Sequence, residues 1–252
     1  VLSAICTGKV ISRDLIYGAL SCVFWTLILV TTFKYVVVTL RADNKGEGGI
    51  FSLYTLVRRR ATWLIVPAII GGCALLADGM ITPPISVSSA IEGLDYLIPG
   101  IPTVKIVLVI LTLLFFVQQF GTNVVGRFFG PMMLVWFIML AVLGTWHLAR
   151  NPHVLKALNP YYAYNLLVNY PQGFFILGAV FLCTTGAEAL YTDLGHCGRG
   201  NIRVSWVFVK IALVLNYFGQ GSLLVDMAGQ TITADGKTWL GLTPFYSMMP
   251  QW

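Results

Sequence analysis

Six long apolar stretches limit what this chain can fold into more than any other feature. They lie near residues 15–40, 63–98, 103–120, 128–149, 172–193 and 202–225, and polar or Gly/Pro-rich segments separate them. A membrane-spanning helix needs about 20 apolar residues, whereas a barrel strand needs about 10 residues of alternating polarity. No such alternation occurs here. The pattern therefore predicts an all-α membrane protein, a polytopic helical bundle with about six transmembrane helices.

The composition agrees with an environment of lipid. Of the 252 residues, 57% are hydrophobic and only 10% are charged, which is too apolar for a soluble domain. The net charge of +6 does not indicate nucleic-acid binding, because most basic residues lie in loops between apolar stretches. The cluster Arg58-Arg59-Arg60 predicts that the loop 41–62 is cytoplasmic. We expect a multi-pass protein of the cell (inner or plasma) membrane.

The second stretch contains a carboxylate and two hydroxyl groups at helical spacing. Asp78, Thr82 and Ser86 are spaced i, i+4, i+8, so a helix places them along one face. The pair Pro83-Pro84 has no backbone N–H groups, and this leaves two carbonyl oxygens of the helix without their usual donors. An ionisable group in lipid is costly and marks a functional site. Because a dehydrated alkali cation prefers such oxygen ligands, we expect a cation site here.

Glu92 lies further along the same stretch. At 1.5 Å per residue it is roughly 21 Å beyond Asp78 toward the outer side. This position suits a solvated residue at the mouth of an ion pathway and a ligand of the ion equally well. We predict an entrance role.

A third carboxylate follows a helix-breaking signal in the fifth stretch. In Thr184-Thr185-Gly186-Ala187-Glu188, Gly186 permits a break. Many secondary transporters build ion sites from such discontinuous helices. A carboxyl group removed from water favours its neutral form and can exchange a proton near neutral pH, which predicts a proton-coupling role for Glu188. The structural alternative is that Glu188 caps or bonds a neighbouring helix.

Other motifs predict no catalysis. Gly46-Glu47-Gly48-Gly49 lacks the lysine and spacing of a phosphate-binding loop, so we interpret it as a tight cytoplasmic turn. The five cysteines show no spacing for zinc or for a disulfide framework. No Ser/His/Asp or Cys/His set can be assembled on one side of the membrane. We expect neither an enzyme nor a cofactor.

Several phrases of the sequence closely resemble the KUP/HAK/KT potassium-uptake permeases. They are RADNKGEGGI (41–50), DGMITPPISV (78–87), AIEGL (90–94), TGAEALY (185–191) and LNYFGQG (215–221). They run through most of the chain in the family's order. The resemblance implies a LeuT-like (APC superfamily) fold of about twelve helices and potassium:proton symport. Potassium ions, protons and lipid are then the partners, and a homodimer is an assembly to be tested.

The resemblance also assigns residues. Asp78, Thr82 and Ser86 match the family's potassium ligands, Glu188 matches its glutamate after Thr-Gly, and Thr185 lies near that glutamate and joins the potassium-binding set. The family's first-helix phrase, which carries an aspartate and a tyrosine of the ion site, is absent from this sequence. We therefore expect residues 1–252 to be part of one membrane transporter domain whose first helix and C-terminal part lie elsewhere.

Three other functions remain open from the sequence. An organic-solute permease of the same fold needs an amine and carboxylate pocket rather than a line of hydroxyl groups. A potassium channel uses TVGYG-like filter loops, which the sequence lacks. A non-transporting scaffold has no need for carboxylates in lipid.

Overall fold

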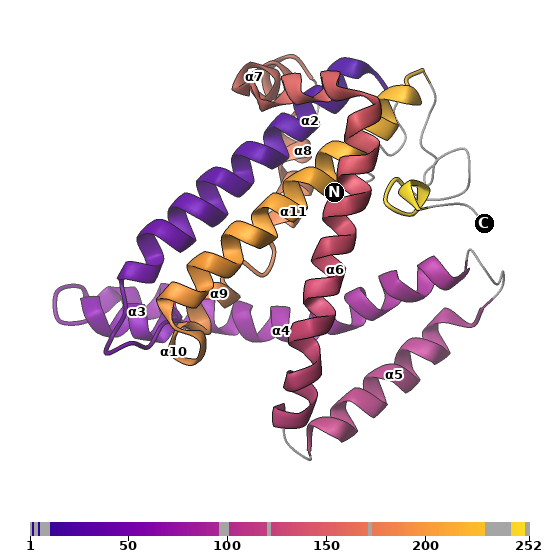
Figure 1. Ribbon diagram of the computed structural model, residues 1–252. Coiled ribbons are helices and arrows are strands. Elements are labelled where there is room, and N and C mark those ends of the chain that lie inside the picture. The colour runs from indigo at the N-terminus through magenta and orange to yellow at the C-terminus, as the bar shows by residue number, and fades with distance from the viewer. Residues whose placement is uncertain are drawn as a thin grey trace. The chain divides into compact units, whose positions relative to one another are not determined.

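The computed structural model describes residues 2, 5, 11–95, 101–119, 122–170, 173–229 and 243–249. Within these ranges the chain is helical, as predicted, with one isolated bridge between Asn44 and Glu47 and no strand (Figure 1). Five segments of this part are long and apolar enough to cross a membrane: Arg13–Arg41, Thr62–Ile91, Phe129–Arg150, Phe175–Thr192 and Arg199–Asp226. The remaining predicted stretch, 103–120, forms a shorter apolar helix, α5 (Thr103–Gln118).

The chain divides into two compact units. The first unit comprises Val1–Gly49 and Trp136–Trp252, and the second comprises Ile50–Val135. Helix α6 (Thr122–Arg150) begins in the second unit and ends in the first. The candidate site residues are therefore distributed over both units.

The first unit begins with a long helical segment that changes its winding. Helix α2 (Arg13–Thr26) begins at Ser12, whose hydroxyl accepts a hydrogen bond from the backbone N–H of Leu15 at 3.2 Å. The segment continues as a π-helix, η1 (Leu27–Val38), and ends in a 3-10 turn, η2 (Thr39–Arg41). A π-helix of 12 residues is unusual, because most are single turns, and they occur frequently at functional sites.

The remaining helices of the first unit follow α6. They are η4 (Pro152–Leu158), α7 (Pro160–Asn169), α8 (Gly173–Phe181), η5 (Leu182–Thr184), α9 (Ala189–Thr192), α10 (Leu194–Cys197), α11 (Arg199–Asp226) and η6 (Tyr246–Met248). Asn159 caps α7 by accepting the N–H of Tyr161 at 2.9 Å, and Pro160 occupies the first helical position.

Glycines allow close helix packing in this unit. A Cβ atom on Gly219 of α11 would lie 2.6 Å from the Cα atom of Gly144 of α6. A Cβ atom on Gly18 of α2 would lie 2.6 Å from the Cβ atom of Leu166 of α7. Membrane helices associate through this kind of contact, since lipid offers no hydrophobic driving force between them.

The second unit contains α3 (Ile50–Val57), η3 (Thr62–Leu64), α4 (Ile65–Asp95) and α5. Helix α4 has 31 residues, which is about 46 Å and longer than the hydrocarbon core of a bilayer. It continues through Pro83 and Pro84 without interruption. Its apolar side chains are highly exposed, for example Leu76 at 71% and Met80 at 77%, as lipid-facing residues can be.

Candidate ion-binding site

The predicted face of α4 forms as expected from its spacing. Asp78 is half-buried, whereas Thr82 and Ser86 are exposed, and all three lie on one uninterrupted helix. The Thr82 hydroxyl donates a hydrogen bond to Oδ1 of Asp78 at 3.0 Å. Ser86 is a further turn along, about 12 Å from Asp78 at 1.5 Å per residue. The structure thus brings Asp78 and Thr82 into contact, with Ser86 next along the face.

The hydrogen bond between Thr82 and Asp78 leaves capacity for a cation. A hydroxyl group has one proton to donate and two lone pairs to offer, so Thr82 can bond Asp78 and still coordinate an ion. The carboxylate has two oxygens and accepts through only one of them in this bond. The side chain of Glu92, the predicted entrance residue, lies outside the described residues.

The predicted break in the fifth apolar stretch is confirmed. Helix α8 passes into η5 and then into a turn at residues 185–188, before α9 resumes at Ala189. Gly186 has a φ of 85°, a left-handed conformation that side chains with a Cβ atom rarely adopt. Glycine is therefore the residue that allows the chain to turn here.

Glu188 holds this turn together. Its Oε1 atom accepts a hydrogen bond from the backbone N–H of Gly186 at 3.2 Å. The carboxylate is half-buried. This hydrogen bond is a capping interaction, as expected if Glu188 has a structural role. It occupies only one of the two carboxylate oxygens. A capping role and a proton-carrying role are therefore compatible.

Thr185 lies at the start of the turn and borders a cavity. The cavity has a volume of about 240 Å³, and its lining includes Thr31 of η1, Thr184, Thr185, Gly186, Ser205 and Trp206. The helices that line it, η1, η5, α9 and α11, belong to the first unit. Sequence reasoning missed Thr31 and Ser205, because an isolated hydroxyl group in an apolar stretch gives no spacing signal.

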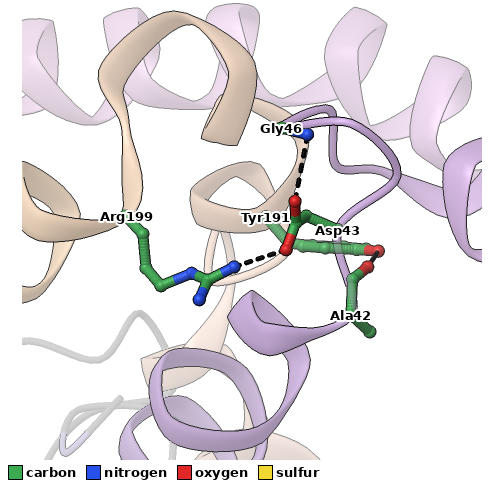
Figure 2. A network of polar contacts seen from close by, with 5 residues as sticks. All are labelled: Ala42, Asp43, Gly46, Tyr191 and Arg199. Carbon is green, nitrogen blue, oxygen red and sulfur yellow. Dashed lines mark hydrogen bonds and ion pairs between the residues drawn. The ribbon is translucent and has the colours of Figure 1, made fainter.

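A polar network connects the loop after η2 with the segment that follows the break (Figure 2). Asp43 forms an ion pair with Arg199 at the start of α11, and its second oxygen accepts the N–H of Gly46 at 3.0 Å. The Tyr191 hydroxyl of α9 donates to the carbonyl oxygen of Ala42 at 2.5 Å. The contacts of Asp43 with Arg199 and of Tyr191 with Ala42 join residues about 150 positions apart, and the sequence pattern did not indicate them.

The glycine-rich segment in this loop forms the predicted tight turn. Asn44 and Glu47 exchange backbone hydrogen bonds of 2.9 and 3.1 Å. Gly46 and Gly49 have φ values of 88° and 93°, which glycine adopts readily. A Cβ atom on Gly48 would collide with the carbonyl oxygen of Tyr191, so glycine is also needed for close approach.

Long apolar helices, a helix broken at Gly186 and carboxylates within the apolar segments are typical of integral membrane transporters. The chain belongs to the family described as the K+ potassium transporter integral membrane domain, whose model matches residues 1–252.

Curated relatives support this family throughout the chain. A "Probable potassium transport system protein Kup" of Cytophaga hutchinsonii is 60% identical over 257 residues, covering 100% of this chain and 38% of the relative. Proteins of the same name from Flavobacterium psychrophilum and Clostridium perfringens are 58% and 55% identical, covering 100% and 96% of this chain. They are covered over 38% and 37% of their own lengths, so the chain spans less than two-fifths of these relatives. No solved structure matches the chain.

Proposed function

We propose that this chain forms part of a potassium:proton symporter of the cell (inner or plasma) membrane. The main observation behind this proposal is that the family model of the potassium-transporter domain matches residues 1–252. The relatives named as potassium transport system proteins support it, as does the oxygen-rich face of α4. We further propose the LeuT-like fold, with lipid as the surrounding medium and a homodimer as the assembly to test.

Each candidate residue has a role in this proposal. Asp78 supplies the negative charge that offsets the cost of removing water from potassium, and Thr82, Ser86 and Thr185 supply neutral oxygens. Glu188 carries the coupled proton, and Glu92 lies at the entrance. The hydrogen bond from the Thr82 hydroxyl to Oδ1 of Asp78 fixes the orientation of the carboxylate. The other carboxylate oxygen is then available to the ion.

The position of Glu188 in the turn supports the proposal of proton coupling. When the carboxylate is ionised, it accepts the Gly186 N–H and attracts a nearby cation. When it is protonated, the negative charge is lost and the affinity for a cation falls. A carrier that exchanges between these forms can link proton movement to potassium movement.

The proposal is tested in a full-length protein that contains this sequence, made in cells lacking their own potassium uptake. We expect growth at low potassium and uptake of rubidium. Asp78→Ala should abolish uptake, because it removes the negative charge that offsets the cost of removing water from the ion. Asp14→Ala is the matched control, since this exposed carboxylate lies in the first turn of α2.

Three results would count against the proposal, and they separate its parts. A wild-type protein that reaches the membrane but carries neither rubidium nor potassium would refute potassium transport and favour a scaffold. Transport of an amino acid or another organic solute in place of potassium would favour an organic-solute permease. Near-wild-type uptake by Asp78→Ala, with a functional wild type, would refute only the assignment of the ligand.

A further inference from the structure

The second unit begins with a short apolar helix whose side chains are not covered. Helix α3 (Ile50–Val57) contains no charged residue, and none of its residues is buried. Phe51, for example, is 62% exposed. With 8 residues the helix is about 12 Å long, which is too short to cross a hydrocarbon core of about 30 Å. Its apolar side chains therefore need a cover that water does not provide.

Two glycines hold α3 against the beginning of α4. A Cβ atom on Gly71 would lie 3.2 Å from Cδ1 of Ile50, and one on Gly72 would lie 2.5 Å from Cζ of Phe51. Both glycines lie in the first turns of α4, which begins at Ile65, so α3 folds back beside this end of α4 (Figure 1). The position of α3 is thus fixed by the helix that spans the membrane.

Three arginines without partners lie on the turn that follows α3. The turn is ordered, since the N–H of Arg58 donates to the carbonyl oxygen of Tyr54 at 2.9 Å. The side chains of Arg58-Arg59-Arg60 are exposed, and within the part of the chain that the structure describes none of them forms a hydrogen bond or an ion pair. No Asp or Glu occurs in residues 48–77. Three positive charges are therefore uncompensated at this turn.

Trp63 lies between these arginines and the membrane-spanning part of α4. It is 71% exposed, and the apolar segment Thr62–Ile91 begins next to it. Tryptophan is enriched where a membrane meets water. A short apolar helix, a basic cluster and an exposed tryptophan are the features of a segment that lies in the membrane interface.

The charge of the turn indicates which molecule covers this surface. Anionic lipids of the cytoplasmic leaflet attract basic residues near the membrane, and the loop that contains the arginines is predicted to face that side. A guanidinium group can bind two phosphate oxygens through parallel hydrogen bonds. A phospholipid supplies both acyl chains for the apolar side chains of α3 and a phosphate for the arginines.

We propose that α3 and Arg58-Arg59-Arg60 form a binding surface for an anionic phospholipid, with the headgroup at the arginines and the acyl chains against α3. The inference goes beyond the proposed function, because it concerns a bound lipid and not the transported ion. It also goes beyond membrane orientation, since it assigns a ligand to the arginines in the folded protein.

The test uses the full-length protein in bilayers of phosphatidylcholine and phosphatidylglycerol. A bimane dye is attached to Thr62→Cys in an otherwise cysteine-free protein, because Thr62 is exposed and lies next to the arginines. Brominated acyl chains quench the dye when the lipid lies beside it, so bromination of one lipid at a time measures the local preference. We expect phosphatidylglycerol to be preferred roughly fivefold or more, and less as the salt concentration rises.

Substitution of the arginines should remove this preference. In the triple variant with Arg58→Gln, Arg59→Gln and Arg60→Gln the preference should fall to within about twofold of none. Arg59→Gln alone leaves two arginines to orient the protein and should give an intermediate value. Lysine at all three positions keeps the charge and should retain most of the preference, although an ammonium group does not form the paired hydrogen bonds.

A matched control removes three positive charges elsewhere. Arg13→Gln, Lys105→Gln and Lys156→Gln change exposed side chains of other segments and alter the net charge by the same amount. This variant should keep the preference of wild type. A general effect of protein charge would instead lower the preference in both triple variants and would overturn the inference.

The remaining outcomes also decide the matter. Equal quenching by the two lipids around wild type, or a preference that survives in the glutamine variant, would overturn the inference. A dye that neither lipid quenches would show that protein, such as a second copy of the chain, covers α3 instead. Loss of the preference when inorganic phosphate is added at constant ionic strength would identify free phosphate, not lipid, as the occupant.

Discussion

At the scale of single residues, Glu188 combines a structural bond with a titratable group. Glutamine retains a carbonyl oxygen that can accept the Gly186 N–H, but it cannot release a proton. Glu188→Gln should therefore keep the turn while it removes coupling. We expect rubidium to enter down its gradient but not to accumulate against it, with uptake independent of external pH.

Uptake measured at acidic and alkaline external pH, with and without a proton uncoupler, checks this prediction. Glu188→Ala is the comparison, because it loses the bond to Gly186 together with the charge. Accumulation by Glu188→Gln that equals wild type would remove the coupling role and leave Glu188 as a cap of the turn.

At the scale of helices, the contact between α6 and α11 depends on two glycines. Gly219→Ala places a methyl group 2.6 Å from the Cα atom of Gly144, where the backbone cannot move aside without shifting a helix. We expect a loss of roughly 1–3 kcal/mol in stability, as for other overpacked sites. Thermal unfolding in detergent measures it.

Gly178→Ala is the control for this prediction. Gly178 lies in α8, and a Cβ atom there would meet nothing within 4 Å. Because alanine favours helix over glycine, this variant should be neutral or stabilised by up to about 1 kcal/mol. Equal effects of the two variants would show that the close approach of α6 and α11 does not limit stability.

The ion pair between Asp43 and Arg199 couples the loop after η2 to the start of α11. The two side chains are 27% and 40% exposed, so solvent screening should keep their coupling energy at or below about 1 kcal/mol. A double-mutant cycle with Asp43→Asn and Arg199→Gln measures this energy. Asparagine keeps an oxygen for the Gly46 N–H, so the turn should survive.

The coupling should also fall as the salt concentration rises, because the pair is partly exposed. A coupling of several kcal/mol that is insensitive to salt would contradict this prediction. It would indicate that lipid or another segment shields the pair in the membrane.

At the scale of the whole molecule, the distribution of basic residues predicts orientation. The loop that contains Arg58-Arg59-Arg60 should face the cytoplasm, and the loop that contains His153 should face outward. In a cysteine-free background, a membrane-impermeant thiol reagent added outside intact cells should label His153→Cys but not Arg59→Cys. Labelling of Arg59→Cys from outside would reverse the predicted topology.

Local features of this chain were predictable from its sequence. The helical class, the break at Gly186, the tight turn at Gly46–Gly49 and the contact of Asp78 with Thr82 depend on residues within a few positions of one another. Their physical causes are apolar length, the freedom of glycine at positive φ and the helical repeat. The π-helical winding of η1 is an exception, since no residue type in it demands five-residue hydrogen bonding.

What the sequence by itself determined is therefore a helical membrane protein with carboxylates and hydroxyl groups at defined points along its helices. Tertiary structure decided which of these groups find partners far away in the sequence. Asp43 forms an ion pair with Arg199 across 156 positions, whereas the buried hydroxyl group of Thr31 has no hydrogen-bond partner. Such pairings depend on how helices that are distant in the sequence pack against one another. Neither the periodicity nor the composition of the sequence predicts this packing.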